Sequence, residues 1–348
     1  MHRAILLVAL AGVGCGTFKT APAEARRATP RVHGIVLPGA PPTGDVLMDY
    51  IAYDRAHGRV WVPAGNTGSV DVLDATSDRV ARIEGFSTAE IERHGTKRTV
   101  GPSSVTVGDG VVYVGNRGDS SVCAIDAAAL KKLGCVKLDA APDGLAYVAA
   151  THEVWVTTPR DKSIHIVDVA RPDALAAKGR IHFEGEPEGF AVDDTRGLFY
   201  TNLEDADRTL VIDVKTHEII HTWMPACGSD GPRGLALDEH LDFLFVACTD
   251  HVVVLDAGHD GKHLSSVVTG PGLDNIDYVA RRRELFAAAS RAATLTVARV
   301  DAHGTLTAVA VVPTAPGARN AVATEEGTAF LTDSPEGKIL VVSPATNR

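Results

Sequence analysis

The stretch "GPRGLALDEHLDFLFVACTDHVVVLDA", residues 231–257, predicts three short β-strands in succession. Its apolar runs, 235–237, 244–247 and 252–255, are separated by polar and charged residues at 238–240 and 249–251 that are typical of turns. The two later runs are apolar at every position, which indicates strands buried on both faces. Three strands cannot bury both of their own faces, so neighbouring segments must cover them.

This unit recurs along the chain. Its second strand aligns with six other segments: "RVWVPAG" (59–65), "VVYVGNRG" (111–118), "EVWVTTPR" (153–160), "GLFYTNLED" (197–205), "ELFAAASR" (284–291) and "TAFLTDSP" (328–335). The spacing between successive copies is 41–52 residues, and a third strand such as "TLVIDV" follows each copy. A fourth, more polar strand usually completes the unit, as in "EIIHTWMP" (218–225). This period predicts an all-β, seven-bladed β-propeller with four-stranded blades, a single domain over residues 31–348.

The last blade lacks an outer strand, because its sequence ends at "KILVVSP". The strand-like run "RVHGIVLPG" (31–39) precedes the first blade and is not assigned to any of the seven blades. We expect this N-terminal strand to close the last blade and remove the open sheet edge.

The segments "PEGFAVDDTRGLFYTNLEDADRTLVIDV" and 231–257 resemble the YVTN/YncE-like family of bacterial exported propellers. The resemblance covers roughly residues 35–345 and rests on P-x-G-φ-A-φ-D followed by φ-φ-V/Y-x-N. It implies the propeller fold. It leaves the function open, because this scaffold carries binding proteins, lactonases and cofactor-dependent oxidoreductases.

The N-terminus resembles an export signal. "MHRAILLVALAGVGCG" places Arg3 before an apolar run too short to span a membrane, so we predict a signal peptide over 1–15 and a flexible tether over 16–30. Cys15 stands where a lipoprotein signal carries its lipidated Cys, although Gly12 replaces the usual Leu. Lipidation and plain cleavage both remain open, and with them a periplasmic or a membrane-anchored location.

Four further cysteines fit an oxidising compartment. Cys123 and Cys135 lie symmetrically about a short connection, so two antiparallel strands bring them within bridging distance. The remaining pair is Cys227–Cys248. Zinc is the rival interpretation, and it is disfavoured because the spacings are not of the C-x₂-C type.

The candidate ligand-binding residues occupy the x of P-x-G, where each innermost strand begins at the rim of the channel. They are Asp49, Ser103, Asp143, Glu188, Arg233, Asp274 and Arg319. Polar residues after the second strands extend this set: Asn66, Asn116, Arg117, Asn202, Glu204 and Asp205. The alternating charges either neutralise one another and order the blades, or offer two arginines to an anion.

The sequence favours binding over catalysis. It contains no C-x-x-C-H, G-x-S-x-G, Walker or H-E-x-x-H motif, and we expect no cofactor and no metal site. A net charge of −10 argues against nucleic acid as a partner. We expect a monomeric envelope protein, held to a membrane only through a lipid anchor, that binds a small anion or a partner protein. The alternative is a lactonase- or lyase-like enzyme acting at the channel mouth.

One segment departs from the repeat. "FSTAEIERHGTKRTVGPSS" (86–104) lengthens the connection between the first two blades, and its Ser/Thr start predicts a single helical turn. Its position beside Ser103 makes it a candidate lid for the channel.

Overall fold

A computed structural model describes residues 30–42, 44–93 and 95–345. The predicted signal peptide, Cys15 and almost all of the tether lie outside the described residues. No helix in the described part of the chain is long and apolar enough to cross a membrane.

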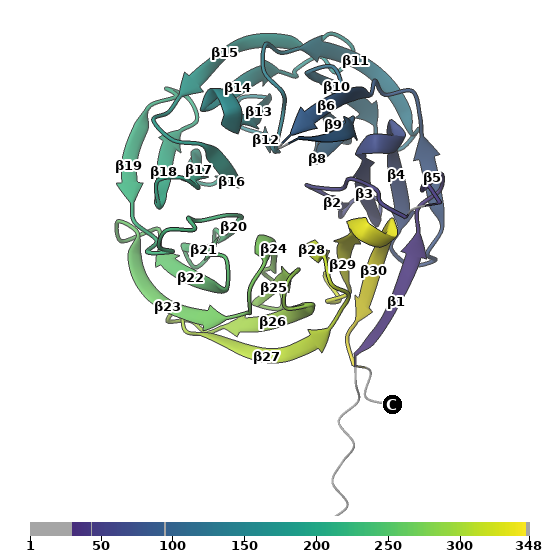
Figure 1. The fold of residues 1–348 in the computed structure, drawn as a ribbon. Helices are drawn as coiled ribbons and strands as arrows, with labels where there is room; N and C mark the ends of the chain where they lie inside the picture. Colours follow the sequence, from purple (N-terminus) through teal and green to yellow (C-terminus); the bar gives the residue numbers. More distant parts are fainter. Residues whose placement is uncertain (1–29, 43, 94, 346–348) are drawn as a thin grey trace, which may run out of the picture.

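Seven four-stranded antiparallel sheets surround a central channel (Figure 1), so the predicted propeller is confirmed. The innermost strands are β2 (Ala52–Asp54), β8 (Pro102–Gly108), β12 (Leu145–Val148), β16 (Pro187–Asp193), β20 (Leu235–Asp238), β24 (Leu273–Val279) and β28 (Ala318–Ala323). The second strands are β3 (Arg59–Ala64), β9 (Val111–Asn116), β13 (Glu153–Thr158), β17 (Leu198–Leu203), β21 (Phe243–Ala247), β25 (Glu284–Ala289) and β29 (Ala329–Asp333).

The third strands are almost wholly buried. They are β4 (Ser69–Asp74), β10 (Ser121–Asp126), β14 (Ser163–Asp168), β18 (Arg208–Asp213), β22 (His251–Asp256), β26 (Thr294–Val300) and β30 (Lys338–Ser343). The outer strands are β5 (Val80–Ile83), β11 (Lys131–Lys137), β15 (Ala176–His182), β19 (Ile219–Trp223), β23 (Lys262–Val268), β27 (Leu306–Pro313) and β1 (Arg31–Val36). Three short 3₁₀ turns follow second strands: η1 (Gly65–Thr67), η2 (Pro159–Asp161) and η3 (Ser334–Glu336).

The last blade is built from both ends of the described chain. β1 pairs antiparallel with β30, with Arg31 opposite Ser343 and Val36 opposite Lys338. The strand is shorter than the run 31–39, because the chain leaves the sheet at Leu37 and turns at Gly39 (φ 70°).

The repeated Asp at the end of the third strand has a local role. The side chain of Asp126 accepts hydrogen bonds from the backbone N–H groups of Ala128 and Ala129, and Asp213 does the same for Lys215 and Thr216. A short carboxylate that receives nearby backbone donors fixes the turn to the outer strand. The D-A and D-V pairs of the repeat are therefore turn signals.

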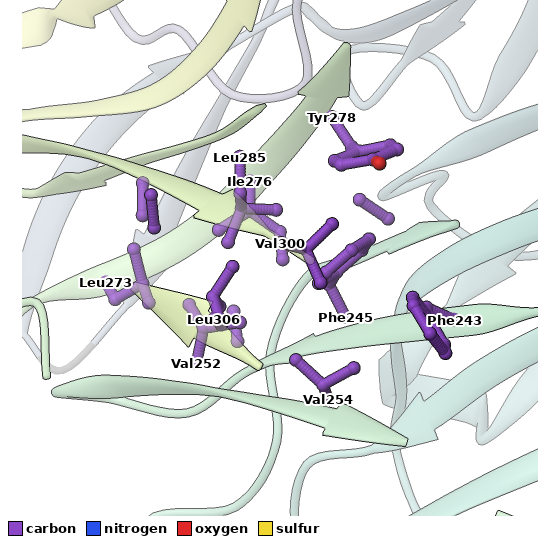
Figure 2. Packing of buried hydrophobic residues seen from close by; sticks show 14 residues of the cluster. Phe243, Phe245, Val252, Val254, Leu273, Ile276, Tyr278, Leu285, Val300 and Leu306 are labelled. Carbon is purple, nitrogen blue, oxygen red and sulfur yellow. The ribbon is translucent and has the colours of Figure 1, made fainter. Parts of the chain in front are cut away.

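Neighbouring blades bury each other's faces. On β21, Phe245 packs toward blade 6 while Leu244 and Val246 pack toward blade 4. Figure 2 shows the cluster between blades 5 and 6, where the ring centroids of Phe245 and Tyr278 lie 4.6 Å apart. This alternation explains why the runs 244–247 and 252–255 are apolar at every position.

Both predicted disulfides are present. Cys123 and Cys135 are direct register partners on β10 and β11, with Cα atoms 4.0 Å apart. Cys227 is bonded to Cys248, with a Cα separation of 5.2 Å.

The predicted helical turn in residues 86–104 is wrong. β6 (Ala89–Arg93) and β7 (Thr96–Val100) form a two-stranded hairpin instead. Gly95 (φ 73°) supplies the turn, and the Glu90 carboxylate pairs with the Lys97 ammonium at 2.9 Å. Cross-strand pairing of Thr- and Val-containing β7 with β6 outweighs the Ser/Thr capping signal. The role of the hairpin as a lid stays a prediction.

Candidate functional site

The candidate site lies at one end of the channel, called here the mouth, where every innermost strand begins. Each blade is an antiparallel meander, so the x positions of the repeated P-x-G all arrive at this end. The glycines that end the P-x-G motifs allow adjacent blades to approach each other closely. A Cβ on Gly189 would lie 2.2 Å from the backbone oxygen of Arg233.

A continuous arc of alternating charges runs over five blades of the mouth. The Arg319 guanidinium donates to Asp274 at 2.6 Å and lies 3.8 Å from Asp49. The Arg117 guanidinium donates to Asp49 at 3.1 Å and also to Asp143. The order Asp274, Arg319, Asp49, Arg117, Asp143 follows blades 6, 7, 1, 2 and 3, so each arginine joins two carboxylates from neighbouring blades.

The alternation breaks at blades 4 and 5. The carboxylate of Glu188 accepts a hydrogen bond from the Tyr50 hydroxyl at 3.0 Å and has no cationic partner among the described residues. Arg233 donates to Glu204 and to the backbone oxygen of Asp230. Blade 4 therefore holds a mouth carboxyl that has no ion pair among the described residues.

Ser103 does not line the mouth with its side chain. It is buried, and its hydroxyl lies 3.4 Å from the backbone oxygens of both Gly115 and Pro142. Arg117, which follows the second strand of the same blade, occupies the mouth in its place. The sequence suggested Arg117 only as an extension of the site.

The other suggested extensions divide into two groups. Glu204 lies at the mouth with Arg233. Asn66, Asn116, Asn202 and Asp205 instead hydrogen-bond to nearby backbone groups, as when Asn202 donates to the backbone oxygen of Arg233. These four side chains order the loops that carry the site.

Burial shifts Asp143 and Glu188 at the mouth toward their neutral forms. Burial raises the pKa of Asp143 to about 6, although Arg117 opposes the shift. Burial and the nearby Asp143 and Asp274 carboxylates raise the pKa of Glu188 well above its usual range. Burial opposes ionisation of Arg117, but the carboxylates of Asp143 and Asp49 outweigh it and raise its pKa. Glu188 thus keeps its proton more readily than Asp143 does.

Tyr50 extends across the channel directly beneath the mouth. It stands at the Gly position of P-x-G in blade 1, yet its hydroxyl reaches Glu188 on blade 4 and its ring stacks on Phe190 at 5.5 Å. Gly144 on blade 3 leaves the space, since a Cβ there would lie 3.2 Å from Tyr50 Cζ. Sequence analysis missed Tyr50. The departure of "MDYIAYD" from P-x-G was the signal for it.

A cavity of about 280 Å³ lies below Tyr50, on the axis of the propeller. It shares six lining residues with a second cavity of about 400 Å³: Arg55, Thr106, Phe190, Leu235, Ile276 and Asp277. We call the two together the axial cavity. Glu239 and Tyr278 line its far part, toward the loops that follow the innermost strands.

Within the described residues, no three His, Cys, Asp or Glu side chains are arranged to hold a metal ion.

Comparison with solved structures supports the fold. The chain is similar to a streptogramin B lyase structure, with a TM-score of 0.69 and 12% identity over 90% of this chain and 97% of that one. It is similar to a catalytically inactive virginiamycin B lyase from Staphylococcus aureus with quinupristin, with a TM-score of 0.69 and 11% identity over 91% and 100% of the chains. It is also similar to the RRP9 WD40 repeats, with a TM-score of 0.67 and 10% identity over 90% and 97%.

These identities show the propeller fold alone. No model of a known protein family matches the chain, and no curated protein sequence matches it.

Proposed function

We propose that this protein is an exported, YVTN/YncE-like propeller that works as a binding or scaffold protein in the cell envelope, with the mouth as its binding surface. The observation that carries the proposal is the pairing of all three mouth arginines, Arg117, Arg233 and Arg319, with carboxylates. A rigid, ion-paired rim is pre-organised to present hydrogen-bonding groups to a partner. The two disulfides support an oxidising, exported location.

The charge balance of the mouth favours a partner protein with basic side chains over a small anion. Five carboxyl groups face three arginines: Asp49, Asp143, Glu188, Glu204 and Asp274 against Arg117, Arg233 and Arg319. An anion must displace a carboxylate from an arginine before it binds. A lysine or arginine of a partner meets an excess of acceptors, and its charge would favour the ionised form of Glu188, which has no ion pair among the described residues.

The experiment compares small probes by their effect on the melting temperature of the purified protein, because a ligand that binds only the folded state raises it. The probes are acetyl-Gly-Arg-Gly-amide, acetyl-Gly-Asp-Gly-amide and citrate, at equal ionic strength. We expect stabilisation by the arginine peptide that weakens in Glu188→Gln and persists in Asp173→Asn, whose carboxyl lies on the exposed outer turn of blade 3. Stabilisation by citrate alone would favour the anionic ligand, and no response to any probe would count against the mouth as a binding surface.

A second candidate function is a lactonase- or lyase-like enzyme at the same mouth. It is favoured by Glu188, whose raised pKa leaves a proton available for general acid catalysis at the half-buried channel mouth. The test is hydrolysis of dihydrocoumarin as a representative lactone. This candidate requires turnover that Glu188→Gln abolishes and that falls as pH rises, because the acid must be protonated.

A further inference from the structure

The axial cavity contains a carboxylate where the repeat calls for a small apolar residue. The A of P-x-G-φ-A-φ-D is Ala52, Ala146, Ala191 and Ala236 in blades 1, 3, 4 and 5. These small side chains leave the axis open. Blade 6 carries Asp277 at this position, and Asp277 lines both parts of the axial cavity.

Asp277 has backbone partners but no counterion. Its carboxylate accepts hydrogen bonds from the backbone N–H of Ala323 at 2.7 Å and of Tyr278 at 2.9 Å. The cation nearest in the cavity wall, Arg55, donates instead to Glu325 at 2.9 Å. Within residues 30–42, 44–93 and 95–345, no ion pair involves Asp277. Two donors hold the carboxylate in place. Burial raises the pKa of Asp277 and Arg55 lowers it without forming an ion pair, so a ligand with a positive charge would favour its ionised form.

The rest of the wall suits an apolar body. Phe190, Leu235 and Ile276 line both parts of the cavity, and Tyr50 closes the end toward the mouth. Asn275 adds a buried side-chain N–H that has no partner among the described residues. An apolar pocket with a few fixed polar groups is the usual form of a small-molecule site.

We propose that the axial cavity binds a small organic amine, with its ammonium at the Asp277 carboxylate and its apolar body against Phe190 and Ile276. The amine enters from the face opposite the mouth, because Tyr50 blocks the other end. Glu239, which lines the far part of the cavity, adds a second carboxylate on that route. Carboxylate ligands are disfavoured by the same two charges. The proposal is independent of binding at the mouth, since no mouth residue other than its closing Tyr50 takes part.

If Asp277 only links blades 6 and 7, the loss of its charge should not affect the binding of an amine. Its bond to Ala323 joins β24 to β28 across blades 6 and 7. In Asp277→Asn the side-chain oxygen still accepts from Ala323, while the charge is lost. The substitution therefore separates the link between blades from the recognition of a cation.

The test measures the affinities of benzylamine, benzyl alcohol and benzoate by titration calorimetry. These probes share the ring and differ in charge. We expect benzylamine to bind at least tenfold more tightly than the other two, and Asp277→Asn to reduce this difference to less than twofold. Asp173→Asn, outside the cavity, should leave the tenfold difference unchanged.

The outcome is readable even if Asp277→Asn folds poorly. Ala191→Leu fills the cavity without changing a charge and should abolish benzylamine binding, since Ala191 lines the cavity wall. Three results would overturn the proposal: no binding of benzylamine at about 10 mM, benzoate binding as tightly as benzylamine, or an Asp277→Asn variant that binds benzylamine as tightly as wild type. A concentration of about 10 mM is the weakest affinity expected of a fragment of this size.

Discussion

The hydroxyl of Tyr50 on blade 1 donates a 3.0 Å hydrogen bond to the carboxyl of Glu188 on blade 4, across the channel. Blades 1 and 4 are not neighbours in the ring, so this contact crosses the axis that the other blade-to-blade contacts surround. It separates the charged mouth from the axial cavity. It also holds a carboxyl whose pKa burial raises well above its usual range.

Tyr50→Phe should lower the free energy of unfolding by about 1–2 kcal/mol, because the half-buried Glu188 loses its hydrogen-bond partner. Urea unfolding at pH 7 measures the change. Tyr53→Phe is the control, since the Tyr53 ring also lines the axial cavity and its hydroxyl has no hydrogen bond within the described residues. Equal effects of the two substitutions would contradict the role of the Tyr50 hydroxyl.

Arg117→Met should destabilise the fold more than Arg233→Met. Arg117 joins Asp49 and Asp143, whereas Arg233 has the single carboxylate of Glu204. Removing one member of a partly buried ion-pair network leaves charges uncompensated, at a cost of about 2–4 kcal/mol at pH 8 for this partly exposed arginine. The loss should be smaller at pH 5, because Asp143, with its pKa raised to about 6, then binds a proton. Denaturant midpoints at both pH values test the order, and an Arg233→Met defect as large as that of Arg117→Met would refute it.

Asp71→Asn should stabilise the protein above pH 7. Asp71 is fully buried, its carboxyl lies 3.7 Å from the Arg82 guanidinium, and burial raises its pKa to about 7. A carboxyl whose pKa rises on folding contributes stability below its unfolded pKa, and this contribution is lost as pH rises through 7. Wild type should therefore lose about 1–3 kcal/mol between pH 5 and 8, and Asp71→Asn should lose less.

Asp74→Asn is the matched control for Asp71. Hydrogen bonds from Thr76 lower the pKa of Asp74 to about 2, so its stabilising contribution is lost only as pH falls toward that value. The substitution should leave the change between pH 5 and 8 as in wild type. Melting temperatures measured between pH 5 and 8 test this. If the melting temperature of Asp71→Asn changed with pH in parallel with that of wild type, the prediction would be wrong.

Leu37→Ala should cost about 2–4 kcal/mol, because it opens a cavity where the chain leaves the closing strand. Leu37 is buried in the cluster that also contains Val46 and Ile339. Val36→Ala, one residue earlier and 60% exposed, should change stability little. Urea unfolding compares the two. Similar small effects would mean that the N-terminal strand does not seal the ring as described.

Double substitution Cys123→Ser with Cys135→Ser should lower the free energy of unfolding by about 3 kcal/mol, because the bridge restricts the unfolded chain. Denatured, unreduced protein without Cys15 should show no free thiol, since both pairs are bonded. Titration with a thiol reagent measures this. Two or more reactive thiols would contradict the pairing.

Periodicity made the fold predictable, because each blade repeats the same strands and the same Asp-capped turns. The x positions also identified six residues that the structure places at the mouth: Asp49, Asp143, Glu188, Arg233, Asp274 and Arg319. Their binding role stays a prediction. Ser103 does not line the mouth, contrary to the prediction. Its short side chain hydrogen-bonds to the backbone oxygens of Gly115 and Pro142, and the longer Arg117 takes its place at the mouth.

The axial residues were harder to predict, because their contacts join blades that are distant in sequence. Tyr50 and Glu188 are 138 residues apart. Nothing within one repeat shows that a Tyr in blade 1 fills space left by Gly144 in blade 3. What the sequence does show is the departure from consensus: Tyr50 in place of Gly, and Asp277 in place of Ala.

The pairing of β1 with β30 also determines which face of the propeller carries the two ends of the described chain. Arg31 lies opposite Ser343, so both ends of the described chain leave side by side. Because β30 descends from η3 at the mouth side, that exit lies on the face opposite the mouth. If the protein were attached to a surface through the segment before Arg31, its charged mouth would face away from that surface. The axial cavity would open toward the surface. An anchored molecule would thus present its mouth and its axial cavity to different surroundings.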